Sequence, residues 1–385
     1  MKRRILVFTG TRAEYGLLRS VVRLWAAMPE VETHLLVSGA HLAEAYGSTV
    51  SEIHLEDVAI HHAPIDLRRN DPAGICRSMG QAMELYGAAL CDLRPDIVVV
   101  LGDRYETFCM AAAAAVSAVP LAHLYGGELT EGAVDEFFRH AITKMAHLHF
   151  TACESYRRRV IQMGENPERV WNVGSLGVEN VHTLTPLPEE ALRRILGLPP
   201  QAPYLVVTFH PPTLEPGTEQ TQLMALLEAL AGLPPEMHVV FTGANADAGG
   251  AVMNIILRQR VEAEPRWRFF LSLGVERYVS ALRYAAGVVG NSSSGLIEAP
   301  SLGLPVLDIG DRQKGRERSP AVLHCAAEGA AIQKGLAHLL EPETLQHART
   351  CSSPYDKPGT ACRIVENIAQ YPLTALARKK FYDAV

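Results

Sequence analysis

The strongest constraint on how this chain folds is a repeated alternation of short apolar runs, rich in β-branched residues, with segments of helix length. Near-continuous apolar strands separated by helices are typical of parallel sheets that are covered by helices on both faces. The expected strands span residues 4–8, 33–37, 96–101, 120–124, 148–151, 204–208, 238–242, 267–271, 287–289 and 305–309. The rhythm restarts after about residue 185, so the sequence predicts two doubly wound α/β domains.

The chain length agrees with two domains, because 385 residues exceed what one ordinary hydrophobic core contains. A proline-rich stretch at residues 183–203 includes a Pro-Glu-Glu helix start and is typical of a linker. We therefore predict Rossmann-like domains at residues 1–182 and 183–365. Residues 366–385 form a third segment, and a helix expected over residues 362–382 would pack back on one of the two domains. Ligands of open α/β sheets bind beyond the carboxyl ends of the strands, so two facing sheets predict a cleft lined by strand-end loops.

The composition excludes several classes of protein. The chain is 48% hydrophobic and 20% charged, and its net charge of −6 without a basic block argues against non-specific nucleic-acid binding. The apolar runs at the N-terminus and at residues 109–119 are too short for a signal peptide or a membrane span. Seven scattered cysteines without a CxxC pair indicate free thiols in a reducing compartment, so we expect a cytoplasmic protein without a zinc site.

Polar residues follow the first two expected strands. The stretch "TGTRAEYGLL" places Gly10 in a turn and Arg12 at the start of a helix, where an anion can bind, although an ordinary turn with a surface arginine is an equal alternative. His41 follows the second strand, where a lone histidine is more often structural than in contact with substrate. The dinucleotide fingerprint GxGxxG and the phosphate loop GxxxxGK[ST] are both absent from the sequence.

Carboxylates gather after the next two strands. Asp103 and Arg104 follow one strand directly in "GDRYET", and Glu128 follows another in "YGGEL". Asp135 and Arg139 are four residues apart on the next helix and share one face, for which a surface ion pair is the simpler explanation. Several carboxylates in one cleft raise one another's pKa, and that suits a general acid or base near neutral pH.

The second half of the chain carries groups that suit an anionic ligand. The stretch "GNSSSGLIEAPSLGLPV" follows a strand and offers the hydroxyls of Ser292 and Ser293 at a helix start, with Glu298 within the helix. These groups can hold a diphosphate and two sugar hydroxyls. The alternative, an ordinary helix with an N-cap serine, would explain only one of the serines. We expect Ser294 to be that N-cap residue.

Three further strand ends add polar or basic residues. His210 directly follows one strand, Asn245 comes after the next, and Arg312 and Arg316 follow the strand after the serine stretch. The residues alone therefore place carboxylates in the first domain and a nucleotide diphosphate in the second.

Several motifs of the chain resemble the UDP-N-acetylglucosamine 2-epimerase family. They are "GTRAEYGLL", "GDRYET", "GGELTEGAVDEFFRHAITKMAHLHFTA", "VTFHPPTLE" and "GNSSSGLIEAPSLGLPVLDIGDRQKGR", in the family's order over residues 4–320. Ala13, in place of the proline of "GTRPE", and the prolines after His210 favour the hydrolysing branch, which makes N-acetylmannosamine-type sugars for sialic and legionaminic acids. The resemblance implies a two-domain fold similar to that of the glycosyltransferase-B enzymes.

The resemblance also implies a role for each candidate residue. Asp103, Glu128, Asp135 and His210 would be catalytic, and Arg12, His41, Arg104, Asn245, Leu273, Tyr278, Ser292, Ser293, Glu298 and Arg312 would bind the substrate. Within that set, Ser292 and Ser293 would contact the diphosphate, Glu298 the ribose, and Tyr278 the surroundings of the base.

The implied reaction is an elimination followed by a hydration. A carboxylate removes the C2 proton while the nucleoside diphosphate leaves C1, and water then adds to the 2-acetamidoglucal with inversion at C2. The route needs no cofactor and no metal, and relatives are commonly homodimers or homotetramers. The choice of base and acid, of UDP or GDP, and of N-acetylglucosamine or a diacetamido-trideoxy sugar stays open.

Two other functions are consistent with parts of the sequence. A glycosyltransferase of the same fold would use the same second domain but would not need the carboxylates at Asp103, Glu128 and Asp135. A catalytically silent nucleotide-sugar sensor would be favoured by loss of Asp103 or Glu128, and both residues are present.

Overall fold

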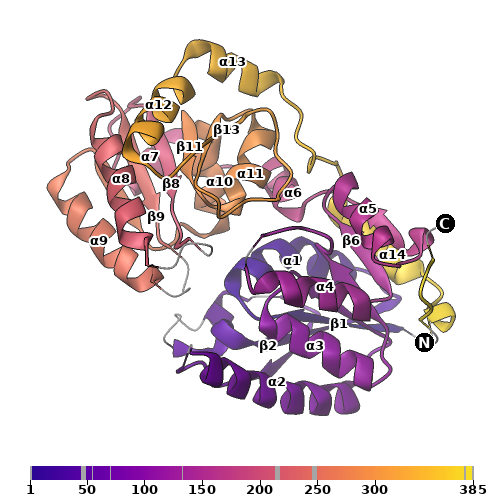
Figure 1. The fold of residues 1–385 in the computed structure, drawn as a ribbon. Coiled ribbons are helices and arrows are strands. Elements are labelled where there is room, and N and C mark those ends of the chain that lie inside the picture. The colour runs from indigo at the N-terminus through magenta and orange to yellow at the C-terminus, as the bar shows by residue number, and fades with distance from the viewer. Residues whose placement is uncertain are drawn as a thin grey trace. The chain divides into compact units, whose positions relative to one another are not determined.

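The structure is a computed structural model that describes the whole chain except residues 1, 45–48, 54, 70, 132, 213–216, 245–248, 377–378 and 384–385. Internal contacts group the chain into two compact units, and each is described by itself (Figure 1). The first unit comprises Met1–Glu128, Val134–Leu176 and Lys357–Val385. The second comprises Leu129–Ala133 and Gly177–Asp356.

The first unit is built on a seven-stranded parallel sheet with the order β3-β2-β1-β4-β5-β6-β7. Its strands are β1 (Arg3–Thr9), β2 (Val31–Ser38), β3 (Ala59–Ala63), β4 (Ile97–Leu101), β5 (Leu121–Leu124), β6 (Leu148–Thr151) and β7 (Val170–Asn172). The strand order reverses between β1 and β4, and such a switch point is where doubly wound sheets bind ligands, beyond the carboxyl ends of the strands.

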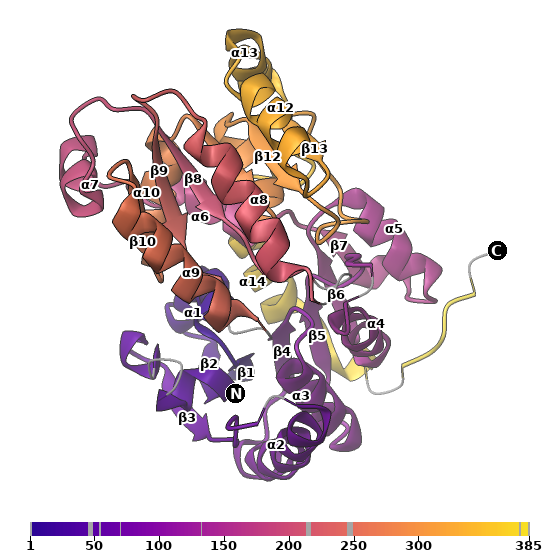
Figure 2. The ribbon, with the colours of Figure 1, turned by 60° about the vertical axis from the view of Figure 1, so that its left-hand side comes forward.

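Helices cover both faces of this sheet (Figures 1 and 2). They are α1 (Arg12–Ala26), α2 (Pro72–Leu93), α3 (Tyr105–Val116), α4 (Asp135–Met145), α5 (Glu154–Gln162) and α14 (Thr360–Gln370). Along β1, Ile5 and Val7 belong to the core cluster shared with α1 and α14, whereas Leu6 and Phe8 belong to the cluster shared with α2 and α3. This alternation buries β1 on both faces and explains its continuous apolar sequence.

The C-terminal helix packs on the first unit. The indole nitrogen of Trp25 on α1 donates to the carbonyl oxygen of Val365 on α14 at 3.3 Å. The helix ends at Gln370, so the expectation of a helix over residues 362–382 was wrong beyond that point. Pro372 explains the end, because proline disfavours the helical conformation of the residue before it.

The second unit is built on a six-stranded parallel sheet with the order β10-β9-β8-β11-β12-β13. Its strands are β8 (Tyr204–Thr208), β9 (His238–Thr242), β10 (Trp267–Phe270), β11 (Gly287–Gly290), β12 (Val306–Ile309) and β13 (Val322–Cys325). Its helices are α6 (Leu176–Thr183), α7 (Glu189–Leu196), α8 (Glu219–Ala231), α9 (Gly250–Ala263), α10 (Gly274–Tyr284), α11 (Ser293–Ile297), α12 (Gly329–Leu339) and α13 (Pro342–Thr350). All ten expected strands are present, and the structure adds β3, β7 and β13, which are short or partly exposed strands at sheet edges.

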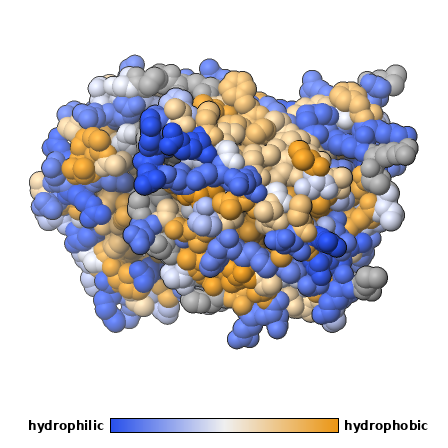
Figure 3. Space-filling view, turned by 90° about the horizontal axis from the view of Figure 1, so that it is seen from below, coloured by the Kyte–Doolittle hydropathy of each residue, from blue (hydrophilic) through white to orange (hydrophobic). Residues whose placement is uncertain are grey.

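The surface carries scattered apolar side chains. Hydrophobic and hydrophilic residues are interspersed over the face shown in Figure 3. Large apolar residues such as Val116 and Phe137 are exposed, as single apolar residues commonly are on protein surfaces. Among the described residues, we find no helix with the length and apolar character that crossing a membrane requires.

The turn after β11 depends on glycine. Gly290 has a φ of +134°, and a Cβ at this position would lie 1.9 Å from the carbonyl oxygen of Thr208 on the neighbouring strand β8. We expect Gly290→Ala to destabilise the second unit by roughly 3 kcal/mol, because the strand pair must separate to admit the methyl group. The measurement is urea unfolding of the full chain. The control is Gly329→Ala, where a Cβ meets no atom within 4 Å, and equal midpoints for the two variants would contradict the prediction.

Candidate functional site

A buried arginine joins the two main carboxylate positions of the first unit. Arg139, on α4, is only 1% exposed. Its Nη2 pairs with the carboxylate of Asp103, which lies just after β4, and its Nη1 donates to the main-chain oxygen of Glu128 at 3.1 Å. Nη1 also donates to the carboxylate of Glu136 at 2.7 Å. The structure therefore brings Asp103 and Glu128 together around the guanidinium of Arg139. From the sequence, the simpler interpretation of Arg139 was a surface ion pair with Asp135.

The three expected acidic residues differ in exposure. Glu128 is buried after the double-glycine turn that follows β5, and the side chain of Asp103 is 24% exposed. Asp135 is exposed at the first position of α4. All three thus lie at the carboxyl ends of β4 and β5 or on the helix that follows, which is where the switch-point rule places a ligand.

A buried histidine on β5 forms a hydrogen bond to the turn after β4, directly before Asp103. His123 is fully buried, and its Nε2 donates to the carbonyl oxygen of Gly102 at 2.8 Å. Its Nδ1 lies 3.2 Å from the hydroxyl of Thr143 on α4. Burial lowers the pKa of His123 to about 3, so the ring is neutral and holds the residue before Asp103 by hydrogen bonds alone. His123 was not among the predicted site residues, because a histidine inside an apolar strand gives no functional signal.

A second pair of buried carboxylates occupies the switch point between β1 and β4. Glu14, on α1, accepts hydrogen bonds from the main-chain nitrogens of Gly10 at 2.7 Å and Thr11 at 3.2 Å. Glu106, on α3, is fully buried and pairs with Arg104, whose Nε donates to it at 3.2 Å. Glu14 lies in the motif "GTRAEYGLL" and Glu106 in "GDRYET", but neither was among the predicted site residues.

The surroundings of Glu14 change its titration. Burial raises the pKa of Glu14 to about 7, with the charge of Arg104 opposing this shift and that of Glu106 adding to it. Arg104, expected to bind substrate, therefore also balances the two glutamates. Arg12 stands exposed at the first position of α1, on the same helix as Glu14.

His41 has the geometry of a structural histidine. The side chain is fully buried, with Nε2 3.1 Å from the hydroxyl of Thr9 and Nδ1 2.9 Å from the hydroxyl of Thr49. Burial lowers the pKa of His41 to about 4. Both ring nitrogens have protein partners, so the structure does not present this ring to a substrate.

In the second unit, an asparagine after β11 fixes the backbone of His210 after β8. The Asn291 side chain accepts from the His210 main-chain nitrogen at 2.7 Å and donates to the His210 carbonyl oxygen at 2.8 Å. The carbonyl oxygen of Asn291 accepts from Gln313 at 2.8 Å and from Arg312 at 3.4 Å. Burial and then the charge of Arg312 lower the pKa of His210 to about 3, so its ring is neutral. Asn291 and Gln313 were missed as site residues, although both lie in quoted motifs.

The serine stretch opens a helix of only five residues, α11. Ser292 occupies its N-cap position, and Ser292 and Ser293 are half-buried. Ser294, expected to cap the helix, instead lies with its hydroxyl 2.7 Å from that of Tyr278. This contact gives Ser294 a partner and places Tyr278 beside the serines.

Glu298 and Leu273 have different surroundings from the serines. A Cβ at Gly177, in α6, would lie 2.1 Å from Oε1 of Glu298, so the carboxylate rests against the glycine backbone. Leu273 is 5% exposed and belongs to a core cluster, where it contributes packing. Asn245 lies outside the described residues.

Each unit thus assembles its own group of candidate residues. In the second unit, β8, β11 and β12 are neighbours in the sheet, and His210, Ser292, Ser293 and Arg312 follow their carboxyl ends. Within the part of the chain that the structure describes, no three His, Cys, Asp or Glu side chains are grouped to hold a metal ion.

Comparison with known proteins identifies the family. Residues 25–369 match the family model described as UDP-N-acetylglucosamine 2-epimerase. The chain belongs to this family. It is 37% identical to the polysialic acid biosynthesis protein P7 of Escherichia coli over 99% of this chain and 97% of that protein. It is 38% identical to the GDP/UDP-N,N'-diacetylbacillosamine 2-epimerase (hydrolyzing) of Campylobacter jejuni over 84% of each chain, so the protein is an enzyme of the hydrolysing 2-epimerase kind.

The fold of the family is also shared. The crystal structure of the UDP-GlcNAc 2-epimerase from Neisseria meningitidis bound to UDP-GlcNAc has a TM-score of 0.78 at 17% identity, covering 95% of this chain and 99% of that one. The predicted fold class, two doubly wound Rossmann-like units of the glycosyltransferase-B type, is confirmed.

The raised pKa of Glu14 predicts a pH-dependent stability. The folded state holds this proton up to about pH 7, whereas the same carboxyl in the unfolded chain releases it near pH 4.5. The free energy of unfolding therefore falls as pH rises between these values. Glu14→Gln keeps an acceptor for the main-chain nitrogens but carries no proton to lose. We expect its stability relative to the native chain to rise by up to about 3 kcal/mol from pH 4.5 to 7, measured by denaturant unfolding. An exposed control, Glu56→Gln, should show no such trend, and a flat difference for Glu14→Gln would refute the assignment.

Proposed function

We propose that this enzyme is a hydrolysing 2-epimerase that converts a UDP- or GDP-linked 2-acetamido sugar into the N-acetylmannosamine-type sugar and the nucleoside diphosphate. The observation that carries the proposal is the Asp103–Arg139–Glu128 arrangement, which sets two carboxylate residues around a buried guanidinium at neighbouring strand ends. Inversion at C2 needs one group that removes a proton and one that returns it, and this arrangement supplies both. A glycosyltransferase has no need of such a pair.

The first step is an elimination across C1 and C2. A carboxylate takes the C2 proton, the C2–H electrons form the double bond, and the C1–O bond breaks so that its electrons leave with the diphosphate. The proton-handling groups are Asp103, Glu128 and Asp135, all of the first unit. Arg139 keeps the carboxylate of Asp103 and the backbone of Glu128 at fixed positions, and orientation of this kind lowers the barrier.

The second step hydrates the 2-acetamidoglucal. Water adds to C1, and a proton reaches C2 from the face opposite to the one that lost it. The product is a free sugar with inverted C2, so no acceptor sugar is consumed. No metal and no redox cofactor takes part in this balance of protons and electrons.

The nucleotide is bound by residues of the second unit. The hydroxyls of Ser292 and Ser293 donate to the diphosphate, the carboxylate of Glu298 accepts from the ribose hydroxyls, and Arg312 offsets the charge of the leaving group. His210 is neutral, so it donates a hydrogen bond without adding a second charge beside Arg312. The support for this assignment is the sheet order, which makes the strands before these residues neighbours.

The direct test of this function is a panel of nucleotide-sugars without an acceptor: UDP-N-acetylglucosamine, UDP-N,N'-diacetylbacillosamine and the GDP-linked counterpart of the latter. We expect one of them to give the nucleoside diphosphate and a free sugar whose H1–H2 coupling in the NMR spectrum shows inversion at C2. Release of nucleoside diphosphate only after an acceptor sugar is added would instead identify a glycosyltransferase.

Glu128 should act on the chemical step and not on nucleotide binding. We expect Glu128→Gln to lower kcat by about a hundredfold or more, because the amide cannot exchange a proton with C2. The dissociation constant for UDP, measured by calorimetry, should stay unchanged because the proposed UDP contacts belong to the second unit. Glu168→Gln, an exposed glutamate of the first unit, is the control and should match the native kcat. A native kcat for Glu128→Gln would remove this residue from the mechanism.

A further inference from the structure

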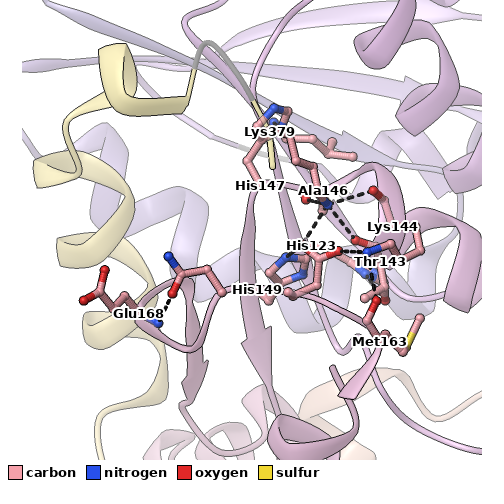
Figure 4. Close-up of polar contacts among 12 residues, drawn as sticks. His123, Thr143, Lys144, Ala146, His147, His149, Met163, Glu168 and Lys379 are labelled. Carbon is pink, nitrogen blue, oxygen red and sulfur yellow. Dashed lines mark hydrogen bonds and ion pairs between the residues drawn. The ribbon is translucent and has the colours of Figure 1, made fainter. Parts of the chain in front are cut away.

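The C-terminal tail of the chain, defined here as residues 379–382, is bound to the end of helix α4 (Figure 4). The ammonium of Lys379 donates to the carbonyl oxygens of Lys144 at 2.7 Å and Ala146, and it lies 3.5 Å from that of Thr143. A helix leaves its last carbonyl groups without partners, and a cation there also meets the negative end of the helix dipole. Lys379 therefore caps α4 from a position more than 230 residues further along the chain.

The same lysine completes a buried ionic group. Glu165 has a side chain only 4% exposed, and it accepts from Lys144 at 2.5 Å, from Lys379 at 2.8 Å and from Nε2 of His149 at 3.0 Å. Burial acts to raise the pKa of Glu165, but the hydrogen bonds and charges of these partners outweigh it and hold the pKa at about 2. Removing one cation from a buried group of this kind leaves a charge poorly compensated, so the contact resists release of the tail.

Three further contacts keep the tail on this surface. The ring of Phe381 lies against Gly164, where a Cβ would come within 2.3 Å of it, and the ammonium of Lys144 stands 4.7 Å from the ring centroid. The main-chain nitrogen of Tyr382 donates to the carbonyl oxygen of Gly164 at 3.0 Å. The tail thus binds Gly164 and Glu165 as well as the last turn of α4, by several kinds of contact at once.

The capped turn of α4 is connected by a chain of contacts to Asp103 and Glu128. Thr143, whose carbonyl lies near Lys379, has its hydroxyl beside His123, and His123 holds the carbonyl of Gly102, the residue before Asp103. One turn earlier on the same helix, Arg139 holds Asp103 and the backbone of Glu128. Two short routes therefore run from the Lys379 cap, one to the backbone before Asp103 and one to the carboxylate of Asp103 and the backbone of Glu128, and neither route leaves the first unit.

We propose that Lys379 is a positioning residue for the epimerisation: by fixing the last turn of α4, it keeps Arg139 and His123 where they orient Asp103 and Glu128. The effect on turnover rests on the proposed function, whereas the effect on α4 does not. The neighbouring Lys380 is exposed and offers a matched control of the same charge and length.

The first experiment compares Lys379→Met with Lys380→Met in the full chain. We expect Lys379→Met to lower kcat about ten- to a hundredfold, because small displacements of catalytic groups have effects of this size. The KM and the dissociation constant for UDP should remain those of Lys380→Met. Lys379→Arg, which restores a cation and several N–H donors, should recover much of the lost kcat. Equal kcat values for Lys379→Met and Lys380→Met would overturn the proposal.

The second experiment needs no substrate. Hydrogen exchange followed by mass spectrometry should show faster exchange in residues 139–146 and 102–104 of Lys379→Met than of Lys380→Met, with the second unit unchanged. Unchanged exchange in those two segments would overturn the proposal even if turnover were never observed. If the native chain released no nucleoside diphosphate from any sugar, the proposed function would fail while this comparison still decided the role of Lys379.

A milder variant covers the case in which Lys379→Met does not fold. Lys379→Gln keeps the length of the side chain and an N–H donor but removes the charge. It should show the same pattern in kcat and in exchange with a smaller amplitude, and a kcat equal to that of Lys380→Met would count against the proposal in the same way.

Discussion

The first unit depends on one buried charge, the guanidinium of Arg139. A buried cation is costly unless it is paired and hydrogen-bonded, and here the carboxylates of Asp103 and Glu136 and the carbonyl of Glu128 meet that requirement. Because these partners come from two strand ends and from α4 itself, satisfying the charge fixes β4, β5 and α4 relative to one another. The carboxylate of Asp103 and the backbone of Glu128, both proposed catalytic residues, are thereby held by the same interaction that makes the burial of Arg139 tolerable.

In the second unit, neutral groups instead of charges hold the strand ends in place. The Asn291 side chain makes two hydrogen bonds to the backbone of His210, so the ends of β8 and β11 are joined across the sheet. The glycine before Asn291 adopts a backbone that no other residue allows without a clash with Thr208. This unit therefore offers hydroxyls, a neutral ring and an arginine for the proposed diphosphate, and we assign the carboxylate of Glu298 to the ribose.

Much of the fold and of the candidate site could be predicted from the sequence. The features that could not be predicted have a physical cause in common. Strands such as β4 are apolar along their whole length because both faces are buried, so they were found, whereas edge strands such as β3 and β13 are partly exposed and lack that signal. The carboxylates and serines predicted to follow strands do follow them, and their roles in binding and catalysis stay predictions. The partners of each side chain were harder to predict. Helical spacing reveals Asp135, four residues before Arg139, but not Asp103, 36 residues away in the chain. The sequence also cannot show that His41 and Leu273 are enclosed by protein atoms.

The central claim is that the nucleotide leaves by elimination, with loss of the C2 proton to an enzyme carboxylate and its return from the other face. The most direct measurement is the reaction in deuterium oxide with the accepted nucleotide-sugar, followed by NMR of the sugar product. We expect one deuterium at C2 in every product molecule, because the returning proton comes from a group that exchanges with solvent. Retention of the substrate's own hydrogen at C2 would contradict it.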